Sequence, residues 1–440
     1  MSDANTTLVA SLRGRSARTG DDAGGRPARG GGRTLFLGRG DRRVPVGGLG
    51  ADSNWKRYVD RKTPAIKEPY GNAVDFRHRY AEDIARARDL GVKAFRFSVE
   101  WARIEPRQGR LDEAELAYYD DVVQHILDAG MKPMITLDHW VYPGWVADQG
   151  GWGGDGMVGE WLANARRVVE RYRGKGAQWI TINEPTVYVL NEIRNGGLPW
   201  FKGLDMLGKL VDAHRQVYDL IHRLDPGARV SSNAAYQPPV EGLLDLTFVD
   251  RVKDKLDFLG VDYYYGASLD NFTAIHGITG EFWKITPQPD GIYFVLRYYA
   301  RKFPNLPLYV VENGMPTDNG TARPDGYSRS QHLRDHLYWV QRAKADGMNV
   351  IGFNYWSITD NYEWGSYRPR FGLYTVDART DPALTRRPTD AVATFRALVR
   401  DGGNPPNYLP VARPSFCSLV DPLSSCLNPP AYPGPLARLP

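Results

Sequence analysis

Two glutamates lie in short motifs that each follow an apolar segment: Glu184 in "TINEP" and Glu312 in "VVENG". A facing pair of carboxyl groups can cleave a glycosidic bond, because one protonates the leaving oxygen while the other attacks the anomeric carbon. Either motif alone is weak evidence, since a glutamate at a strand end is more often solvated or ion-paired than catalytic. The two together, at the ends of strands that open on one face of a fold, favour a catalytic pair.

Aromatic and hydrogen-bonding side chains gather at the ends of these two and of the other apolar segments. Such residues suit a sugar site, because aromatic rings stack on sugar faces while amide and imidazole groups hydrogen-bond hydroxyls. For Trp356 the alternative is packing in the core, and for His139 it is a buried structural histidine. The whole set comprises Glu100, Trp101, His139, Trp140, Asn183, Tyr264, Asn313 and Trp356.

The segments that would position these residues are short, apolar and separated by helical patterns, which predicts a parallel sheet with helical crossovers. An open doubly wound sheet is the alternative. It would place a glycine-rich nucleotide-binding turn after an early strand, and no such turn follows any segment here. Seven strands and a missing first one favour a closed (β/α)8 barrel, the TIM barrel, whose strand ends open on one face. The expected strands span residues 94–101, 132–140, 178–185, 228–235, 257–265, 308–314 and 350–357.

Apolar residues recur at helical spacing between most of these strands. Three of the helices are followed by a glycine just before the next strand, at Gly91, Gly130 and Gly347, as a left-handed C-cap requires. The clearest helices span residues 77–90, 113–129, 204–224 and 328–346.

The composition argues against several other classes of protein. Residues 1–48 hold nine arginines and four acidic residues, which accounts for the whole formal net charge of +5, so the rest of the chain is balanced. A balanced surface does not indicate nucleic acid or membrane binding. No apolar run is long enough to span a membrane, and the N-terminus as written has no apolar signal-peptide core. We expect neither a metal nor a cofactor.

The chain divides into three parts. Residues 1–48 are rich in glycine and arginine and typical of disorder, residues 49–405 form the expected barrel, and residues 406–440 form a proline-rich tail that lies on the surface or free. The two cysteines of the chain, Cys417 and Cys426, are both in this tail. They form either one small disulfide loop or two free thiols, and without a nearby histidine they do not indicate a metal site.

From about Asp52 to Arg400 the chain resembles glycoside hydrolase family 1, the β-glucosidase family. The matching motifs occur in family order, which is far more specific than a shared fold. They are "HRYAEDIARARDLGVKAFRFSVEWARIEP", "LDHW", "WITINEP", "DFLGVDYY", "YVVENG" and "YWSITDNYEW…RFGLYTVD". The resemblance implies a retaining β-glycosidase that hydrolyses terminal non-reducing β-D-glucosyl or related residues by double displacement. Its partner would be a small-molecule or oligosaccharide β-glycoside.

The resemblance assigns the catalytic roles to matching positions. Glu184 matches the acid/base, Glu312 the nucleophile and Asn183 the donor to the sugar 2-hydroxyl. Arg96 and Tyr264 match the groups that support the nucleophile, and a nearby arginine would keep Glu312 ionised. Glu184 must instead start protonated, which we expect to result first from repulsion by Glu312 and then from burial.

Further matches concern the sugar hydroxyls. His139 and Trp140 match the loop that holds the 3-hydroxyl. Glu363 and Trp364 of "NYEW" match the pair that reads the 3-, 4- and 6-hydroxyls.

Trp356 matches the floor on which the sugar ring stacks, and Phe371 lies near the 6-position. Family members that act on 6-phosphosugars replace the glutamate at 363, and Glu363 would repel a phosphate, so we expect unphosphorylated sugars. Thioglucosidases of the family lack the acid carboxylate, and the presence of Glu184 favours ordinary O-glycosides. Asp262 stands where the "NYY" motif of the family has asparagine, and this extra carboxyl would raise pKa values near the nucleophile.

The resemblance fails at the N-terminus. A family member would begin its barrel with a strand resembling "FxWGVATxxFQxEG", whose glutamine binds the 3- and 4-hydroxyls, but "LFLGRGDRRVPVGG" at 35–48 stands there. When residues 38–48 are back-translated and the resulting codons are read one nucleotide later, the string "GVATAGFQSEG" is permitted at every position. This string matches the family motif. We therefore expect residues 1–48 to be an out-of-frame translation, the alternative being a genuine Arg/Gly arm. The chain as written would lack a proper first strand and be poorly folded, and secretion stays open.

Three functions have to be distinguished. The first is hydrolysis, and the second is transfer of the glycosyl group to an alcohol. The third is non-catalytic sugar binding, which a damaged first strand favours and an intact carboxylate pair opposes. The sequence does not determine whether the sugar is gluco, galacto or fuco, nor the aglycone, because the aglycone site is built from variable loops. The oligomeric state and the compartment are likewise undetermined.

Overall fold

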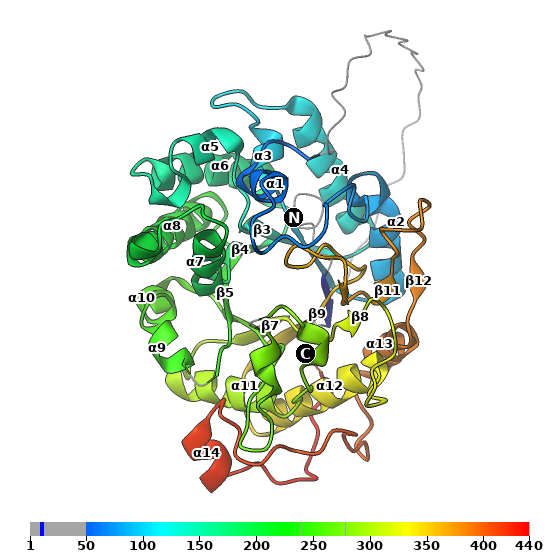
Figure 1. Cartoon of the computed structure of the whole chain (residues 1–440). Coiled ribbons are helices and arrows are strands. Elements are labelled where there is room, and N and C mark those ends of the chain that lie inside the picture. Colours follow the sequence, from blue (N-terminus) through cyan, green and yellow to red (C-terminus); the bar gives the residue numbers. More distant parts are fainter. Residues whose placement is uncertain (1–8, 13–49, 239, 278, 440) are drawn as a thin grey trace, which may run out of the picture.

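The structure is a computed structural model that describes residues 9–12, 50–238, 240–277 and 279–439. Its centre is a closed barrel of eight strands ringed by helices (Figure 1). The seven strands expected from the sequence are all present, and each runs parallel to the next around the barrel. They are β2 (Ala94–Ser98), β3 (Lys132–Asp138), β4 (Gln178–Asn183), β5 (Arg229–Ala235), β6 (Leu259–Asp262), β7 (Leu308–Glu312) and β9 (Val350–Trp356). The prediction of a (β/α)8-type barrel is confirmed.

The eighth strand differs from that of a regular (β/α)8 barrel. β1 (Val9–Leu12) closes the gap between β2 and β9, and its backbone runs antiparallel to both neighbours. All eight strands of a regular barrel are parallel, so the described residues contain no parallel first strand. The expectation of a damaged first strand agrees with this antiparallel strand, which stands where a regular barrel has a parallel one. Of residues 1–48 the structure describes only β1, so the proposal that this segment is translated out of frame stays a prediction.

The four clear helical patterns form helices close to their expected bounds. Asp112 precedes the second of them and accepts hydrogen bonds from backbone N–H groups of its first turn. Gly91, Gly130 and Gly347 have φ values of 81°, 73° and 88°, so each turns the chain from a helix towards a strand in the left-handed region that glycine tolerates. Within the described ranges, no helix combines the length and the apolar character that crossing a membrane requires. The four helices are α2 (Phe76–Asp89), α4 (Glu113–Asp128), α8 (Gly203–Leu224) and α12 (Arg329–Ala345).

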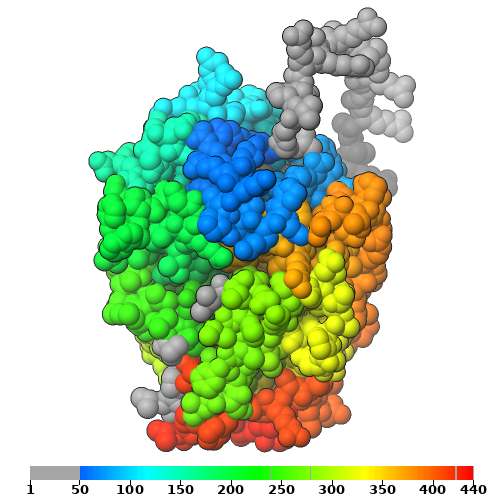
Figure 2. All heavy atoms as spheres, viewed as in Figure 1, coloured from blue at the N-terminus to red at the C-terminus, as the bar shows by residue number. Residues whose placement is uncertain are grey.

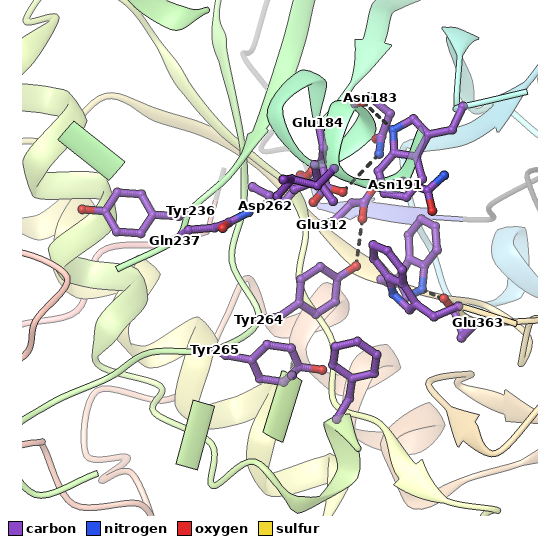
Figure 3. A pocket seen from close by; sticks show the side chains of 18 of the residues that line it. Asn183, Glu184, Asn191, Tyr236, Gln237, Asp262, Tyr264, Tyr265, Glu312 and Glu363 are labelled. Carbon is purple, nitrogen blue, oxygen red and sulfur yellow. Dashed lines mark hydrogen bonds between the residues drawn. The ribbon is translucent and has the colours of Figure 1, made fainter. Parts of the chain in front are cut away.

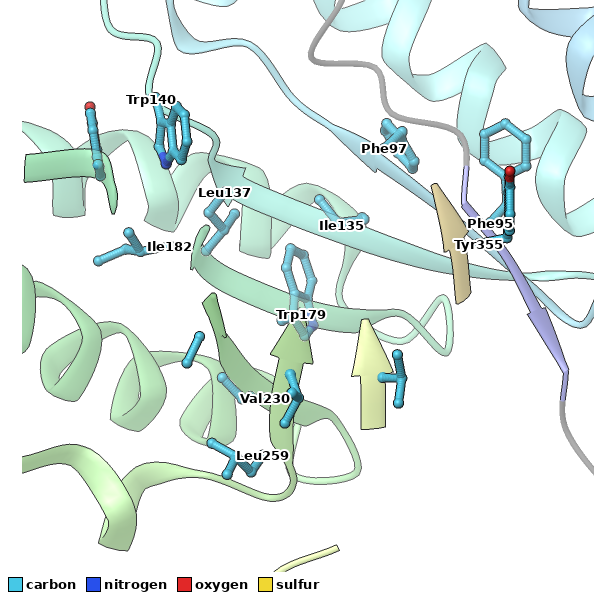
Figure 4. Close-up of a cluster of buried hydrophobic side chains, with 14 of the residues drawn as sticks. Phe95, Phe97, Ile135, Leu137, Trp140, Trp179, Ile182, Val230, Leu259 and Tyr355 are labelled. Atoms are coloured by element: carbon cyan, nitrogen blue, oxygen red, sulfur yellow. The ribbon is translucent and has the colours of Figure 1, made fainter. Parts of the chain in front are cut away.

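Side chains alternate along the strands between two buried layers. Phe95, Ile135 and Trp179 belong to the large cluster between the strands and the surrounding helices (Figure 4). Met134 and Tyr309, each one position away from residues of that cluster, belong to a separate small cluster that fills the barrel. The barrel is therefore a packed core, and the polar side chains that face the cavity lie towards its carboxyl end.

The proline-rich tail lies along the edge of the molecule beside α11 (Gly291–Lys302) and α12 (Figure 2). The Tyr432 ring stacks on Trp339 of α12, with ring centroids 5.9 Å apart. Arg297 of α11 donates a hydrogen bond to the carbonyl oxygen of Asn428 at 2.8 Å. These contacts hold the tail against the outer helices.

Cys417 and Cys426 form a disulfide, which decides between the two alternatives for the cysteines. The loop that they close reaches the segment after β6. There the backbone N–H of Leu419 donates to the carbonyl oxygen of Ala267 at 2.7 Å. The tail therefore contacts and supports the segment that follows β6.

Candidate active site

A cavity of about 430 Å³ opens at the carboxyl ends of the strands (Figure 3). Its position follows from the fold, because Asn183 ends β4, Glu312 ends β7 and Trp356 ends β9. Arg96 lies on β2 and does not line the cavity itself, but its guanidinium contacts Glu312 and Asn183, which do. The other ten predicted site residues all line the cavity: His139, Trp140, Asn183, Glu184, Tyr264, Glu312, Trp356, Glu363, Trp364 and Phe371.

Glu184 and Glu312 meet in this cavity. Glu184 directly precedes α7 (Pro185–Arg194) and has a left-handed φ of 39°. Non-glycine residues held in that region cluster at functional sites, where the surrounding structure holds the strain. One carboxyl oxygen of Glu184 lies within 4.8 Å of one of Glu312, and an oxygen of Asp262 lies within the same distance of both. The structure thus brings together the two glutamates that the sequence analysis paired.

Glu312 has partners that favour its charged form. Arg96 forms an ion pair with it through Nη1, and the Tyr264 hydroxyl donates to its Oε2 at 2.8 Å. The Arg96 side chain is itself fixed by donation from Nε to Thr136 Oγ1 at 2.9 Å. Burial raises the pKa of Glu312, while Arg96 and then Tyr264 oppose that rise. Glu312 is therefore the carboxylate suited to attack as an anion.

Glu184 has the opposite environment. In the described part of the chain, no lysine or arginine forms an ion pair with it, and its side chain is buried. Burial raises the pKa of Glu184 well above its usual range, and the negative charge of Glu312 raises it further. The expected order of these two causes was wrong: desolvation is the larger one, because the surrounding loops and aromatic rings exclude water from the carboxyl group. Glu184 is therefore the carboxyl suited to hold a proton.

The orientation of the Asn183 amide is fixed by two donors. Arg96 Nη2 donates to its Oδ1 at 2.5 Å, and Asn233 Nδ2 donates to the same oxygen at 2.7 Å. The Nδ2 group must then point the other way, where it lies 3.5 Å from Glu184 Oε2. This arrangement presents N–H donors into the cavity, as a residue that binds a sugar hydroxyl requires.

Trp356, Phe371 and Glu363 form one side of the cavity. Trp356 packs on Phe371 in a small apolar cluster, so its ring forms a cavity wall rather than part of the main core. Its indole N–H donates to Glu363 Oε1 at 2.9 Å, and Asn361 Nδ2 donates to the same oxygen at 3.4 Å. Burial raises the pKa of Glu363 to about 7. The second carboxyl oxygen of Glu363 can accept a hydrogen bond from a hydroxyl group.

His139 and Trp140 hold the segment after β3. Trp140 has a φ of 70°, and its indole N–H donates to the carbonyl oxygen of Asn183 at 2.8 Å. Asp138 accepts from the Trp140 backbone N–H at 2.8 Å, which fixes the turn. Burial, followed by the charge of Arg96, lowers the pKa of His139 well below its usual range. His139 is therefore a neutral imidazole that can hydrogen-bond a hydroxyl.

Comparison with known protein families matches residues 47–239 and 245–404 to glycosyl hydrolase family 1. The chain belongs to glycosyl hydrolase family 1. It is 29% identical over 367 residues to the chloroplastic galactolipid galactosyltransferase of Arabidopsis thaliana, covering 73% of this chain and 57% of that protein. The chain therefore spans little more than half of this relative.

Two further relatives agree with the family assignment. β-Glucosidase A of Thermotoga maritima is 25% identical over 396 residues, which cover 75% of this chain and 87% of that protein. The apo structure of β-glucosidase 1317 is similar with a TM-score of 0.68 and 28% identity, covering 80% of this chain and 95% of that chain.

Several parts of this family 1 site were not predicted. Tyr236, Tyr265 and Phe282 line the outer cavity. Tyr236 directly follows β5 and Tyr265 lies just after β6, so the strand-end rule could have found both, whereas Phe282 lies on a loop whose course the sequence does not fix. Asn233 was also missed, although its place on β5 follows the same strand-end rule that found Asn183.

Three residues that the strand-end rule did single out lie elsewhere. Glu100 and Trp101 begin α3 (Trp101–Ile104) outside the cavity, and Asn313 donates to the Tyr263 carbonyl oxygen at 2.6 Å. Among the described residues, the cavity lining begins at His139, so the glutamine that a family first strand would supply has no counterpart there.

Proposed function

We propose that this chain is a retaining β-glycosidase of the β-glucosidase type, with Glu312 as nucleophile and Glu184 as acid/base. The observation that carries the proposal is the short distance between their carboxyl oxygens, within 4.8 Å. Retaining glycosidases place the two carboxyl groups about 5–5.5 Å apart, whereas inverting enzymes need roughly 6.5–9.5 Å to accommodate a water molecule. An oxygen–oxygen distance within 4.8 Å supports the retaining arrangement.

The different surroundings of the two glutamates favour different catalytic roles for them. Glu312, paired with Arg96, attacks the anomeric carbon and forms an ester with the sugar. Glu184 gives its proton to the leaving oxygen, and the departing aglycone is a neutral alcohol. Glu184 then takes a proton from water, whose oxygen attacks the same carbon and releases Glu312. Two displacements on one carbon return it to its original configuration.

The cavity suits an uncharged sugar carrying an apolar aglycone. Glu363 disfavours a phosphate, and the Trp356 ring offers a face for stacking. Beyond the carboxyl groups, Val187, Leu190 and Phe282 make the outer wall apolar. The substrates that fit are therefore small β-glucosides or related glycosides with aryl or alkyl aglycones.

Proton NMR of nitrophenyl β-glucoside turnover tests the proposal directly. We expect the β-anomer of the free sugar to appear first and the α-anomer to grow only by slow equilibration. Methanol added to the reaction should also yield the methyl β-glycoside, since an alcohol can replace water in the second displacement. An α-anomer formed first, or no turnover across a panel of nitrophenyl glycosides, would reject the assignment.

Replacement of Glu363 by serine is expected to weaken recognition of the sugar. The loss of a charged hydrogen bond costs about 1–3 kcal/mol, which is roughly a 5–150-fold loss of kcat/KM. The effect should be large for nitrophenyl glucoside and small for nitrophenyl xyloside, which lacks the 6-hydroxymethyl group. Glu281→Ser is the matched control, because Glu281 pairs with Lys284 outside this cavity. Unchanged discrimination between glucoside and xyloside would remove Glu363 from this role.

A further inference from the structure

A third carboxyl group belongs to the catalytic cluster. Asp262 ends β6, and its backbone lies in register with Glu312 on the neighbouring strand. The Asp262 side chain is only 1% exposed. One of its oxygens lies within 4.8 Å of oxygens of both Glu184 and Glu312, and the three residues converge in the cavity (Figure 3). A hydrogen bond between two carboxyl groups requires a proton on one of them.

The positive charge near Asp262 is smaller than the negative charge that three ionised carboxyl groups would carry. Arg96 is the cation nearest to the three carboxyl groups in the described ranges, and its guanidinium is directed at Glu312 and Asn183. Asn233 Nδ2 donates to Asp262 Oδ2, whereas Asp262 Oδ1 has no hydrogen-bond partner among the described residues.

Among the described residues, His139, Tyr264 and Glu363 also face the cluster, and none supplies positive charge, because burial and the charge of Arg96 keep His139 neutral. Burial raises the pKa of Asp262 well above its usual range, followed by repulsion from Glu312 and Glu184. Three buried carboxyl groups with one guanidinium retain at least one proton near neutral pH, and the best-placed site for it lies between the two groups that lack an ion pair.

We propose that Asp262 and Glu184 hold one proton between them and act as a single acid/base unit, with Asp262 as the positioning residue. This inference rests on the proposed function. Asp262 does not contact the bond that breaks, and it acts by making Glu184 a weaker acid in the resting enzyme. The Asn233 amide anchors one oxygen of Asp262, which leaves the other available for the shared proton.

The reaction balances with this unit. In the first displacement Glu312 bonds to the anomeric carbon, the glycosidic C–O bond breaks, and the shared proton moves to the leaving oxygen. Glu312 becomes a neutral ester while Glu184 and Asp262 both become anionic, so the total charge of the site is unchanged. The two adjacent anions then form a stronger base than one carboxylate. In the second displacement they take the proton of the attacking water, and the original charges are restored.

The test is the pH profile of kcat/KM for Asp262→Asn with nitrophenyl glucoside. The active form needs the proton on Glu184, so the alkaline limb reports its loss. Asparagine removes the neighbouring negative charge, and Glu184 should then lose its proton at lower pH. We expect the alkaline limb to move to lower pH by on the order of one to two units. A role limited to holding the fold would lower kcat at every pH without moving the limb.

Asp138→Asn is the matched control for this experiment. Asp138 is also a buried aspartate at a strand end, but it hydrogen-bonds Trp140 and Trp161 instead of Glu184. It should leave the alkaline limb in place even if activity falls. An alkaline limb that stays unmoved in Asp262→Asn overturns the inference while leaving the glycosidase assignment intact. Absence of turnover by the unaltered protein would instead reject the proposed function itself.

Discussion

Glu312→Ala should lose at least about 10⁴-fold in kcat on nitrophenyl β-glucosides, because the variant has no group to form the covalent intermediate. The alanine leaves a space below the anomeric carbon, beside the cationic Arg96 guanidinium that normally pairs with Glu312. A small anion such as azide can occupy that space and attack from the same side as the carboxylate. We therefore expect added azide to produce the α-glycosyl azide, with inverted configuration.

The control for this experiment is another buried glutamate. Glu192 on α7 is fully buried and accepts hydrogen bonds from Tyr58, Tyr142 and Asn54. Glu192→Ala should reduce stability, since it leaves these donors unpaired, but azide should restore nothing. The assignment of Glu312 would be refuted by a Glu312→Ala enzyme that still hydrolyses the substrate normally, or by a β-configured azide product from it.

Most of the barrel could be predicted because its strands are buried on both faces. A strand such as β7 therefore appears as a short apolar run, "LYVV", between amphipathic helices, and the alternation of such runs with helices defines the fold class. β1 could not be predicted. Its four residues lie in a region without any regular pattern, and its place depends on the gap that β2 and β9 leave between them.

The inner site was more predictable than its outer wall for a geometric reason. Barrel closure brings strand ends to one face, so Asn183, Glu312 and Trp356 could be placed together without knowledge of any loop. Phe282 lies in the long loop segment between β6 and α11, and its position depends on tertiary contacts. The order of the causes that raise the pKa of Glu184 depends on those same loops, because they determine how completely water is excluded. A sequence records the charges of a site but not its desolvation.

Glu184→Ala should affect substrates in proportion to their need for protonation. A dinitrophenyl glucoside has a leaving group that departs as a stable anion, so its bond cleavage should be nearly unaffected. An alkyl or phenyl glucoside requires a proton on the leaving oxygen, and for it kcat/KM should fall by roughly 10²–10⁴. The alkaline limb of the pH profile should also disappear, because the group whose pKa is raised by burial and by Glu312 is gone. Equal losses on both substrate types would show that Glu184 is not the acid.

The azide product separates the roles of the two glutamates. In Glu184→Ala the nucleophile Glu312 is intact, so the sugar first becomes attached to it on the α face. Azide then enters through the space that Glu184 vacates on the opposite face, where it meets no negative carboxylate, and the second displacement yields the β-glycosyl azide. Opposite azide configurations from the two alanine variants would identify the face on which each carboxyl group acts, because each anion attacks from the position of the missing side chain. The same configuration from both variants would contradict the division of roles that the Arg96 ion pair suggests.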